Sequence, residues 1–236
     1  MKKLPSLTIF FPSLNEAFIL PQLINDASII AKKIATDYEI IVVDDGSTDN
    51  TLKIVEKLKE KNSKLKIVHH KTNRGYGGAL VSGFSSAKKE WIFYTDADGQ
   101  YSLKELPLLV EKAGDLVDVV NGYKIKRSDS RTRIYIGSIY NWLLHFIYHI
   151  PISDIDCDFR LIRNSVIKKI QLKSNSGLIC LELIMQLQKV GARFKEVGVH
   201  HFHRKYGESR YFKLSHLLNT LREHIIYFSS WLFHRG

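Results

Sequence analysis

The chain has 236 residues, of which 44% are hydrophobic and 25% charged, with 5 prolines and 2 cysteines. This length suits one domain with a single core, and the composition excludes disordered, collagen-like and disulfide-stapled proteins. The formal net charge of +11 predicts attraction to an anionic partner.

The excess positive charge lies in the second half of the chain. Residues 1–120 hold 16 Lys and Arg against 16 Asp and Glu, whereas residues 121–236 hold 19 against 8. We therefore expect the two halves to do different jobs. Cys157 and Cys180 are too few for a disulfide framework and are interpreted as small buried hydrophobic side chains in a reducing compartment. We expect no secretion, because the N-terminal residues lack the features of a signal peptide.

Strand-like and helix-like segments alternate along the first 123 residues. Short apolar runs rich in β-branched and aromatic residues predict strands, and apolar residues three or four apart predict helices. The expected strands are Leu7–Pro12, Glu39–Val43, Leu65–His70, Trp91–Thr95 and Val117–Tyr123, and the expected helices are Ile19–Ala35, Asn50–Lys61, Gly77–Ala87 and Leu103–Ala113. This alternation predicts an α/β fold with a doubly wound, mainly parallel sheet and helices on both faces.

The segment after each of the first four strands is rich in polar residues and glycine. These segments are Pro12–Glu16, Asp44–Asp49, Asn73–Gly78 and Asp96–Gln100. Ligands of doubly wound sheets bind beyond the carboxyl ends of the strands. We therefore expect the four segments to meet at one edge of the sheet, which we call the rim.

Asp96 and Asp98 stand two residues apart at a strand end, so both carboxylates can face one crevice. Mg²⁺ and Mn²⁺ prefer oxygen ligands, and Gln100 adds a neutral oxygen at the next alternate position. The same residues would also serve as turn and capping residues before the next helix. Taken alone, the motif leaves both interpretations open.

The other rim segments have comparable alternatives. Asp44 and Asp45 suit hydrogen bonding to the base or ribose of a nucleotide, with one of the pair contacting the ligand and the other structural, but they also suit a turn. The glycines of Asn73–Gly78 follow neither a Walker nor a Rossmann spacing and allow tight turns and close backbone approach. Glu16 is either a carboxylate in the first turn of a helix or a group that faces the nucleotide.

Together, the rim segments resemble the nucleotide-sugar domain of family 2 glycosyltransferases. The resemblance rests on Pro12, Asn15-Glu16, Val42–Asp49, Asn73–Ala79 and Asp96–Asp98, in this order and spacing. It implies a GT-A-like fold and an inverting transfer that releases a nucleoside diphosphate. It also implies donor contacts at Pro12, Leu14, Glu16, Val43, Asp44, Asp45, Gly75, Asp96 and Ala97.

The second half resembles one branch of that family, the dolichol-phosphate and polyprenol-phosphate sugar transferases. The matching segments are Gly122–Lys124 after the fifth strand, Arg133 to Asn141, Asp154 to Leu161, and Arg204 to Arg210. The resemblance implies a Mg²⁺ or Mn²⁺ ion held by Asp98, Gln100 and Asp96, with Asp98, Arg204 and Asp156 acting in catalysis. It further implies donor contacts from Lys124, Arg204 and Arg210, and acceptor-phosphate contacts from Arg127 and Arg133.

The sequence departs from the branch at four positions. Lys124 replaces the usual arginine and Arg210 the usual lysine, which keeps the charge but moves the bidentate guanidinium. Gly137 stands where serine is common. Asp158 stands where glycine or serine is usual, and it places a carboxylate near the expected acceptor phosphate.

Basic and apolar segments alternate in the second half. Residues 124–133 and 204–213 are basic, which suits a phosphate-rich ligand but is also common on solvated surfaces. Ile134–Ser153 carries no charged side chain, yet a polar stripe at Ser138, Asn141, His145 and His149 argues against a membrane-spanning helix. An interfacial helix and a helix packed on the sheet both remain open, for this segment and for Leu214–Phe233.

The histidines are interpreted as structural. His200, His201 and His203 follow an alternating pattern that predicts an edge strand, and no second ligand cluster accompanies them to make a zinc site. His69 and His70 stand at a strand end and are also expected to be structural.

We expect three parts: a nucleotide-sugar-binding half over residues 1–123, an acceptor-binding half of the same catalytic domain over 124–212, and an amphipathic C-terminal helix over 213–236. The resemblance implies a hexosyltransferase that uses a nucleoside-diphosphate sugar and a polyprenyl phosphate. It would be a cytoplasmic protein bound peripherally at the inner face of the membrane. A separate membrane-protein partner is left open, and nucleic acid is not expected as a partner.

The alternatives differ in what they require of the chain. A lipid monophosphate is already ionised near neutral pH and needs no general base, whereas a sugar hydroxyl acceptor needs one, for which Asp154, Asp156 or Asp158 are the candidates. A nucleotidyltransferase would release pyrophosphate instead of a nucleoside diphosphate. A nucleic-acid-binding module is prompted only by the net charge, and the acidic rim opposes it.

Overall fold

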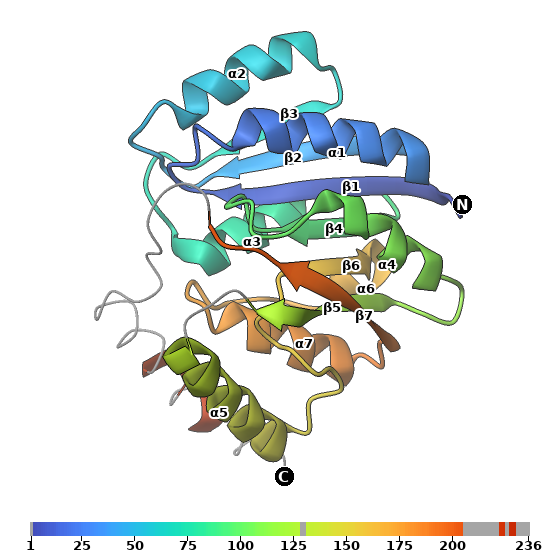
Figure 1. The fold of residues 1–236 in the computed structure, drawn as a ribbon, viewed down its shortest axis with the longest axis vertical. Coiled ribbons are helices and arrows are strands. Elements are labelled where there is room, and N and C mark those ends of the chain that lie inside the picture. Colours follow the sequence, from blue (N-terminus) through green and yellow to red (C-terminus); the bar gives the residue numbers. More distant parts are fainter. Residues whose placement is uncertain (1, 128–130, 205–221, 225–226, 230–236) are drawn as a thin grey trace.

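The computed structural model describes residues 2–127, 131–204, 222–224 and 227–229 (Figure 1). Seven strands form one sheet in the order β3-β2-β1-β4-β6-β5-β7. The strands are β1 (Leu4–Ser13), β2 (Ala35–Asp44), β3 (Leu65–His69), β4 (Trp91–Thr95), β5 (Val119–Arg127), β6 (Phe159–Arg163) and β7 (Phe194–His201). Each pairs in parallel with its neighbours except β6, which runs antiparallel to both β4 and β5. The predicted α/β, mainly parallel sheet is confirmed.

Helices cover both faces of this sheet. They are α1 (Leu20–Ile34), α2 (Thr51–Lys61), α3 (Gly75–Ser86), the 3₁₀ turn η1 (Leu103–Glu105), α4 (Leu106–Lys112), α5 (Arg131–Tyr148), α6 (Asn164–Ile167) and α7 (Ile179–Lys189). Residues of α1, α2 and α4 share one apolar cluster, and residues of α3, α5, α6 and α7 share the other. Figure 1 shows α2 and α5 at opposite ends of the long axis of the molecule.

The central strands are apolar because both of their faces are covered. Along β1, Ile9 and Phe11 join the cluster beneath α1, whereas Phe10 joins the cluster beneath α3. Phe10 stacks on Tyr94 of β4, with ring centroids 5.4 Å apart. This alternation explains why parallel strands read as continuous apolar runs, and it holds the strand ends, and so the rim, in fixed positions.

The sequence locates the first four strands and three helices to within a few residues, but the second half needs corrections. The predicted strand Val117–Tyr123 is instead β5, Val119–Arg127, so Gly122–Lys124 lie inside that strand and not after it. Pairing with β7 along the whole of β5 keeps this backbone extended. Strand β6 and helix α7 were not predicted. The fully buried Arg160 interrupts the apolar pattern of β6.

Helix α5 buries some of its apolar side chains and exposes others: Leu144 and Tyr148 lie in the apolar cluster shared with α7, whereas Trp142 and Phe146 are exposed. Part of its polar stripe also turns inward. Asn141 donates from Nδ2 to the Ser153 carbonyl at 2.7 Å, and His145 Nε2 lies 2.5 Å from the Ile152 carbonyl oxygen. Trp142 and Phe146 are 65% and 70% exposed and stack on each other, with ring centroids 5.8 Å apart. The expected helix packed on the sheet is therefore confirmed for the side with Leu144 and Tyr148, and the side with Trp142 and Phe146 stays exposed.

The remaining expectations concern the end of the chain. Strand β7 is an edge strand that ends at His201, so the edge-strand interpretation is confirmed for His200 and His201 and is wrong for His203, which lies beyond the strand. Cys157 and Cys180 are buried and free, as expected. Within the described part of Leu214–Phe233, residues 222–224 and 227–229 are helical, and the rest of that segment lies outside it. None of the helices that the structure describes has the length and apolar character needed to cross a bilayer.

Candidate functional site

The rim forms where the first two parallel strands end side by side. Pro12 is in register with Val43, and Ser13 with Asp44. Beyond them, Asn15 adopts a positive φ of 59°, and its Oδ1 accepts a hydrogen bond from the Thr48 amide at 2.7 Å. The loops after β1 and β2 are thus joined, as their polar composition predicts.

Asp44 and Asp45 are both buried, and each pairs with a histidine of the neighbouring strand end. Asp44 Oδ2 lies 2.8 Å from His69 Nδ1, and Asp45 Oδ1 lies 2.6 Å from His70 Nδ1. Asp45 also accepts the Arg74 amide at 2.8 Å, which attaches the third rim segment. The structural interpretation of His69 and His70 agrees with these pairs, and a nucleotide contact by either aspartate remains a prediction.

Asp96 and Asp98 follow β4 and form an acidic centre in the rim. Burial raises the pKa of Asp96 well above its usual value, and the charges of Asp158 and Asp98 raise it further. Burial also raises the pKa of Asp98, against the effect of its hydrogen bond with the Gln100 amide. The Tyr76 hydroxyl donates to Asp96 Oδ1 at 2.8 Å. Carboxylates held in this way destabilise one another unless a proton or a cation intervenes.

Arg204 reaches this centre from the segment that follows β7. Its guanidinium pairs with the carboxylate of Glu16, 188 residues earlier. Burial raises the pKa of Glu16 to about 7, with Asp98 and Asp49 adding to the effect and Arg204 opposing it. The structure thereby brings Glu16, Asp98 and Arg204 together.

Asp158, the departure from the family pattern, lies in a buried polar cluster behind the rim. It accepts a hydrogen bond from the Tyr94 hydroxyl at 3.2 Å and pairs with Arg160 at 3.4 Å. The Arg160 side chain is fully buried and also donates to Asn121 Oδ1 at 2.6 Å. The guanidinium therefore compensates the charge of Asp158 inside the fold.

Lys124 is held by the acidic segment that follows α5. Its Nζ donates to the Asp156 carbonyl at 2.8 Å and lies 3.6 Å from Asp154 Oδ1. Burial raises the pKa of Asp156. Lys124 and Asp156 are thus neighbours, and the structure pairs the Lys124 ammonium with carboxylate and carbonyl oxygens, whereas the resemblance implies a contact with the donor.

The other predicted residues are distributed as follows. Leu14 lies in the loop after β1, Gly75 begins α3, and Ala97 is buried between the two rim aspartates. Gln100 donates from Nε2 to the Phe202 carbonyl at 3.0 Å. Arg127 ends β5 and Arg133 lies in the first turn of α5. Arg210 lies outside the described residues.

A divalent cation fits the acidic centre by donor chemistry. Asp96 and Asp98 supply hard carboxylate oxygens whose mutual repulsion a cation would relieve. Within the described ranges, no cluster of three or more His, Cys, Asp or Glu side chains could hold a metal ion. The remaining ligands would therefore be a neutral oxygen, water or a bound diphosphate, which is how Mg²⁺ is usually bound.

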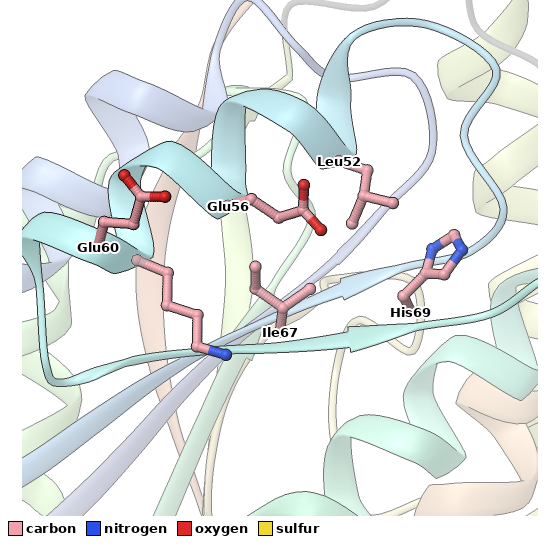
Figure 2. Close-up of a pocket in the computed structure, with 6 residues that line it drawn as sticks. Leu52, Glu56, Glu60, Ile67 and His69 are labelled. Carbon is pink, nitrogen blue, oxygen red and sulfur yellow. The ribbon is translucent and has the colours of Figure 1, made fainter.

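A separate groove lies between α2 and β3 (Figure 2). Leu52, Glu56, Lys59, Glu60, Ile67 and His69 line it. Among these residues, His69 contacts a rim residue through its pair with Asp44. The groove therefore belongs to the outer edge of the sheet and not to the acidic centre.

Sequence reasoning missed two polar residues close to the acidic centre. Tyr76 stands in the predicted glycine-rich segment, but only the fold shows that its hydroxyl reaches Asp96. Arg160 lies in the matching segment Asp154 to Leu161, but only the fold shows that it is the partner of Asp158. The signal available was the unusual aspartate at position 158, because a buried carboxylate requires a partner.

Comparisons with known proteins agree with this geometry. The model of the family described as "Glycosyl transferase family 2" matches residues 8–171. An undecaprenyl-phosphate 4-deoxy-4-formamido-L-arabinose transferase from Pseudomonas fluorescens is 32% identical over 209 residues, which cover 86% of this chain and 59% of that protein. The chain thus spans about three-fifths of the length of this relative.

Solved structures share the fold at low identity. Glucosyl-3-phosphoglycerate synthase from Mycobacterium tuberculosis, in complex with Mn²⁺, UDP and glucosyl-3-phosphoglycerate, matches with a TM-score of 0.71 and 17% identity, covering 94% of this chain and 77% of that one. A mannosyltransferase from Pyrobaculum calidifontis, in complex with GDP-Man and Mn²⁺, matches with a TM-score of 0.64 and 19% identity, covering 93% and 64%. The predicted GT-A-like fold is confirmed.

Proposed function

Since the chain belongs to glycosyl transferase family 2, we propose that it moves a sugar from a nucleoside-diphosphate sugar to a polyprenyl phosphate at the inner face of the membrane. The observation that carries the proposal is the meeting of Asp98, Glu16 and Arg204 at the rim. These residues come from three separate parts of the sequence. They combine groups suited to a divalent cation with a guanidinium suited to a diphosphate.

In the proposed reaction, an acceptor oxygen attacks the anomeric carbon of the sugar while the nucleoside diphosphate leaves. Arg204 would stabilise the negative charge that develops on the leaving diphosphate. Asp96 and Asp98 would hold a Mg²⁺ or Mn²⁺ ion, which supplies Lewis-acid stabilisation of the same charge when bound. Asp44, Asp45, Pro12 and Gly75 would orient the nucleotide.

The acceptor is proposed to be a phosphate because of how the acidic residues after α5 are held. Asp158 is paired with Arg160, and Asp154 lies beside Lys124. A phosphate acceptor needs no base from this segment. The name of the 32% identical relative, an undecaprenyl-phosphate sugar transferase, also supports this choice.

The exposed face of α5 is proposed to lie against the membrane. Ile139, Trp142, Leu143 and Phe146 are exposed on it, and the basic residues 124–133 precede or begin the helix. Aromatic and aliphatic side chains flanked by basic residues suit the surface of an anionic bilayer. Arg127 and Arg133 would then meet the acceptor phosphate at that surface.

Vesicle binding tests the membrane contact. Trp142→Ser with Phe146→Ser should lower partitioning onto vesicles of phosphatidylglycerol and phosphatidylethanolamine by about tenfold or more, because two large apolar side chains no longer leave water. Leu116→Ser is the matched control, since Leu116 is 77% exposed in the loop before β5. An equal loss of vesicle partitioning in both variants would contradict the placement of α5 against the membrane.

Product formation tests the reaction. The protein is incubated with Mn²⁺ or Mg²⁺, undecaprenyl phosphate and a panel of radiolabelled UDP- and GDP-sugars that includes pentose and hexose donors. A labelled lipid and a free nucleoside diphosphate are expected from at least one donor. No labelled lipid from any donor would overturn the proposed acceptor. Release of pyrophosphate in a parallel incubation with nucleoside triphosphates and sugar phosphates would indicate a nucleotidyltransferase.

A sugar hydroxyl is the alternative acceptor, and the raised pKa of Asp156 favours it, since a general base is most effective when its pKa approaches the working pH. Asp156→Asn separates the two cases. The variant should abolish transfer to a hydroxyl and only weaken transfer to a phosphate. Asp158→Asn is not equivalent, because it removes the carboxylate that compensates the buried guanidinium of Arg160.

A further inference from the structure

The start of α3 fits tightly against a distant loop, residues 173–176. The Gly77 amide donates to the Asn175 carbonyl at 3.1 Å. A Cβ on Gly77 would lie 2.1 Å from the Ser174 carbonyl oxygen, and one on Gly75 would lie 2.3 Å from the Asn175 carbonyl oxygen. Gly75 also adopts a φ of +81°. The two glycines therefore allow a backbone contact that any larger residue would push apart.

Two glutamates accept hydrogen bonds from this loop. The buried Glu182 of α7 accepts the amides of Lys173 and Ser174 at 3.0 and 2.9 Å. Glu223 accepts the hydroxyls of Ser174 and Ser176, both at 2.6 Å. Glu223 belongs to residues 222–224 and 227–229, which we call the C-terminal segment.

The C-terminal segment also contacts α5. The ring of Tyr148 lies 6.2 Å from that of Tyr227 and 6.3 Å from that of Phe228, between centroids. The segment is thus held between the helix proposed to face the membrane and the loop that supports α3. On the other side of that loop, Tyr76 donates to Asp96 Oδ1 at 2.8 Å.

We propose that the C-terminal segment positions Asp96 for its cation through the loop 173–176 and Tyr76. Tyr76 is then a positioning residue, and Glu223 acts on the same carboxylate from the far side of the loop. The tight contact at Gly75 and Gly77 is what transmits the position of the loop to Tyr76. This inference rests on the proposed function only in assigning a divalent cation to Asp96.

Cation affinity tests the proposal without any sugar transfer. The apparent affinity for Mn²⁺ in the presence of GDP or UDP is measured by electron paramagnetic resonance, which reports free Mn²⁺ directly. Tyr76→Phe should weaken Mn²⁺ binding roughly tenfold, because residues that orient a metal ligand contribute about 10- to 100-fold to affinity. Glu223→Gln should weaken it roughly threefold, and Ser174→Ala with Ser176→Ala should do the same.

The double variant Tyr76→Phe with Glu223→Gln distinguishes coupling from general damage. If both residues act through one path, the double variant should bind Mn²⁺ about as weakly as Tyr76→Phe alone. Tyr38→Phe and Glu60→Gln are the matched controls, since Tyr38 lies in β2 beside Lys64 and Glu60 is exposed on α2. Both controls should keep the wild-type affinity.

The outcomes separate this inference from the proposed function. An Mn²⁺ affinity within twofold of the wild type in Tyr76→Phe or in Glu223→Gln would overturn the inference alone. Strictly additive losses of affinity in the double variant would do the same. If the variants lose Mn²⁺ affinity as expected but the wild type forms no labelled lipid, the proposed reaction alone would be overturned. Failure of the wild type to bind Mn²⁺ with nucleotide would overturn both.

Discussion

The acidic centre of the rim and the basic second half of the chain use their charged side chains in opposite ways. In the first half, where acids and bases balance, Asp96 and Asp98 are crowded together at the rim with raised pKa values. In the second half, several cations that contribute to the +11 charge are paired with carboxylates: Arg160 with Asp158, Arg193 with Asp118, Lys124 with Asp154 and Arg204 with Glu16. Net charge therefore identifies the basic half but overstates how much of its charge is available to a ligand.

Removing the buried Arg160 should have the largest effect on stability. Arg160→Met leaves Asp158 buried without its guanidinium and should lower the free energy of unfolding by about 3–5 kcal/mol. Urea unfolding followed by circular dichroism measures this loss. Arg160→Met with Asp158→Leu should recover most of it, because the uncompensated charge is gone. A loss under 1 kcal/mol in the single variant would show that the pair is not structural.

Removing a rim carboxylate should lower activity without lowering stability. Asp98→Asn should lower sugar transfer by about 10²- to 10³-fold, the range found when an electrostatic contact to a developing charge is lost. Its free energy of unfolding should stay the same or rise, since a repelling carboxylate is removed. Asp115→Asn, an exposed site at the other end of the sheet, is the control for activity. A lower free energy of unfolding in Asp98→Asn than in the wild type would contradict this difference between the rim and the second half.

The same contrast explains what the sequence predicts and what it does not. The rim residues follow their strands directly, so Asp44, Asp96 and Asp98 can be placed from the strand pattern alone, because parallel strands end at one edge. The second half depends on contacts between distant residues. Arg160 lies in a strand that pairs antiparallel to two others, and Glu16 meets Arg204 across 188 residues. No local pattern encodes such pairings, although family resemblance did identify Arg204.

A structural ion pair at the start of β5 should give a smaller, pH-dependent effect. Hydrogen bonds from Arg193 hold the pKa of Asp118 below its usual value. The amide and Nε of Arg193 donate to Asp118 Oδ2 at 3.0 and 2.9 Å. A depressed carboxyl pKa contributes stability above the pKa of the unfolded chain, and this contribution is lost as the pH falls through the folded value. Asp118→Asn should therefore lower stability at pH 7 by about 1–3 kcal/mol and by less near pH 3. A loss that does not change with pH in urea unfolding would contradict this account.

The contact between the halves, Glu16 with Arg204, should give the smallest effect. Because burial raises the pKa of Glu16 to about 7, the carboxylate is largely neutral at pH 6 and ionised at pH 8, where it competes with an anionic nucleotide for the guanidinium. In metal-free buffer, Glu16→Gln should thus bind GDP or UDP roughly three- to tenfold more tightly than the wild type at pH 8. At pH 6 the variant and the wild type should bind the nucleotide alike. Asp96 and Asp98 titrate in both proteins, so the change in the ratio of the two affinities between pH 6 and pH 8 reports on Glu16. Calorimetry in two buffers should show proton uptake on nucleotide binding near pH 7 in the wild type that Glu16→Gln lacks. Weaker binding by Glu16→Gln at pH 8 would instead mean that the ionised carboxylate orients Arg204 toward the diphosphate, so that the first half positions the cation of the second.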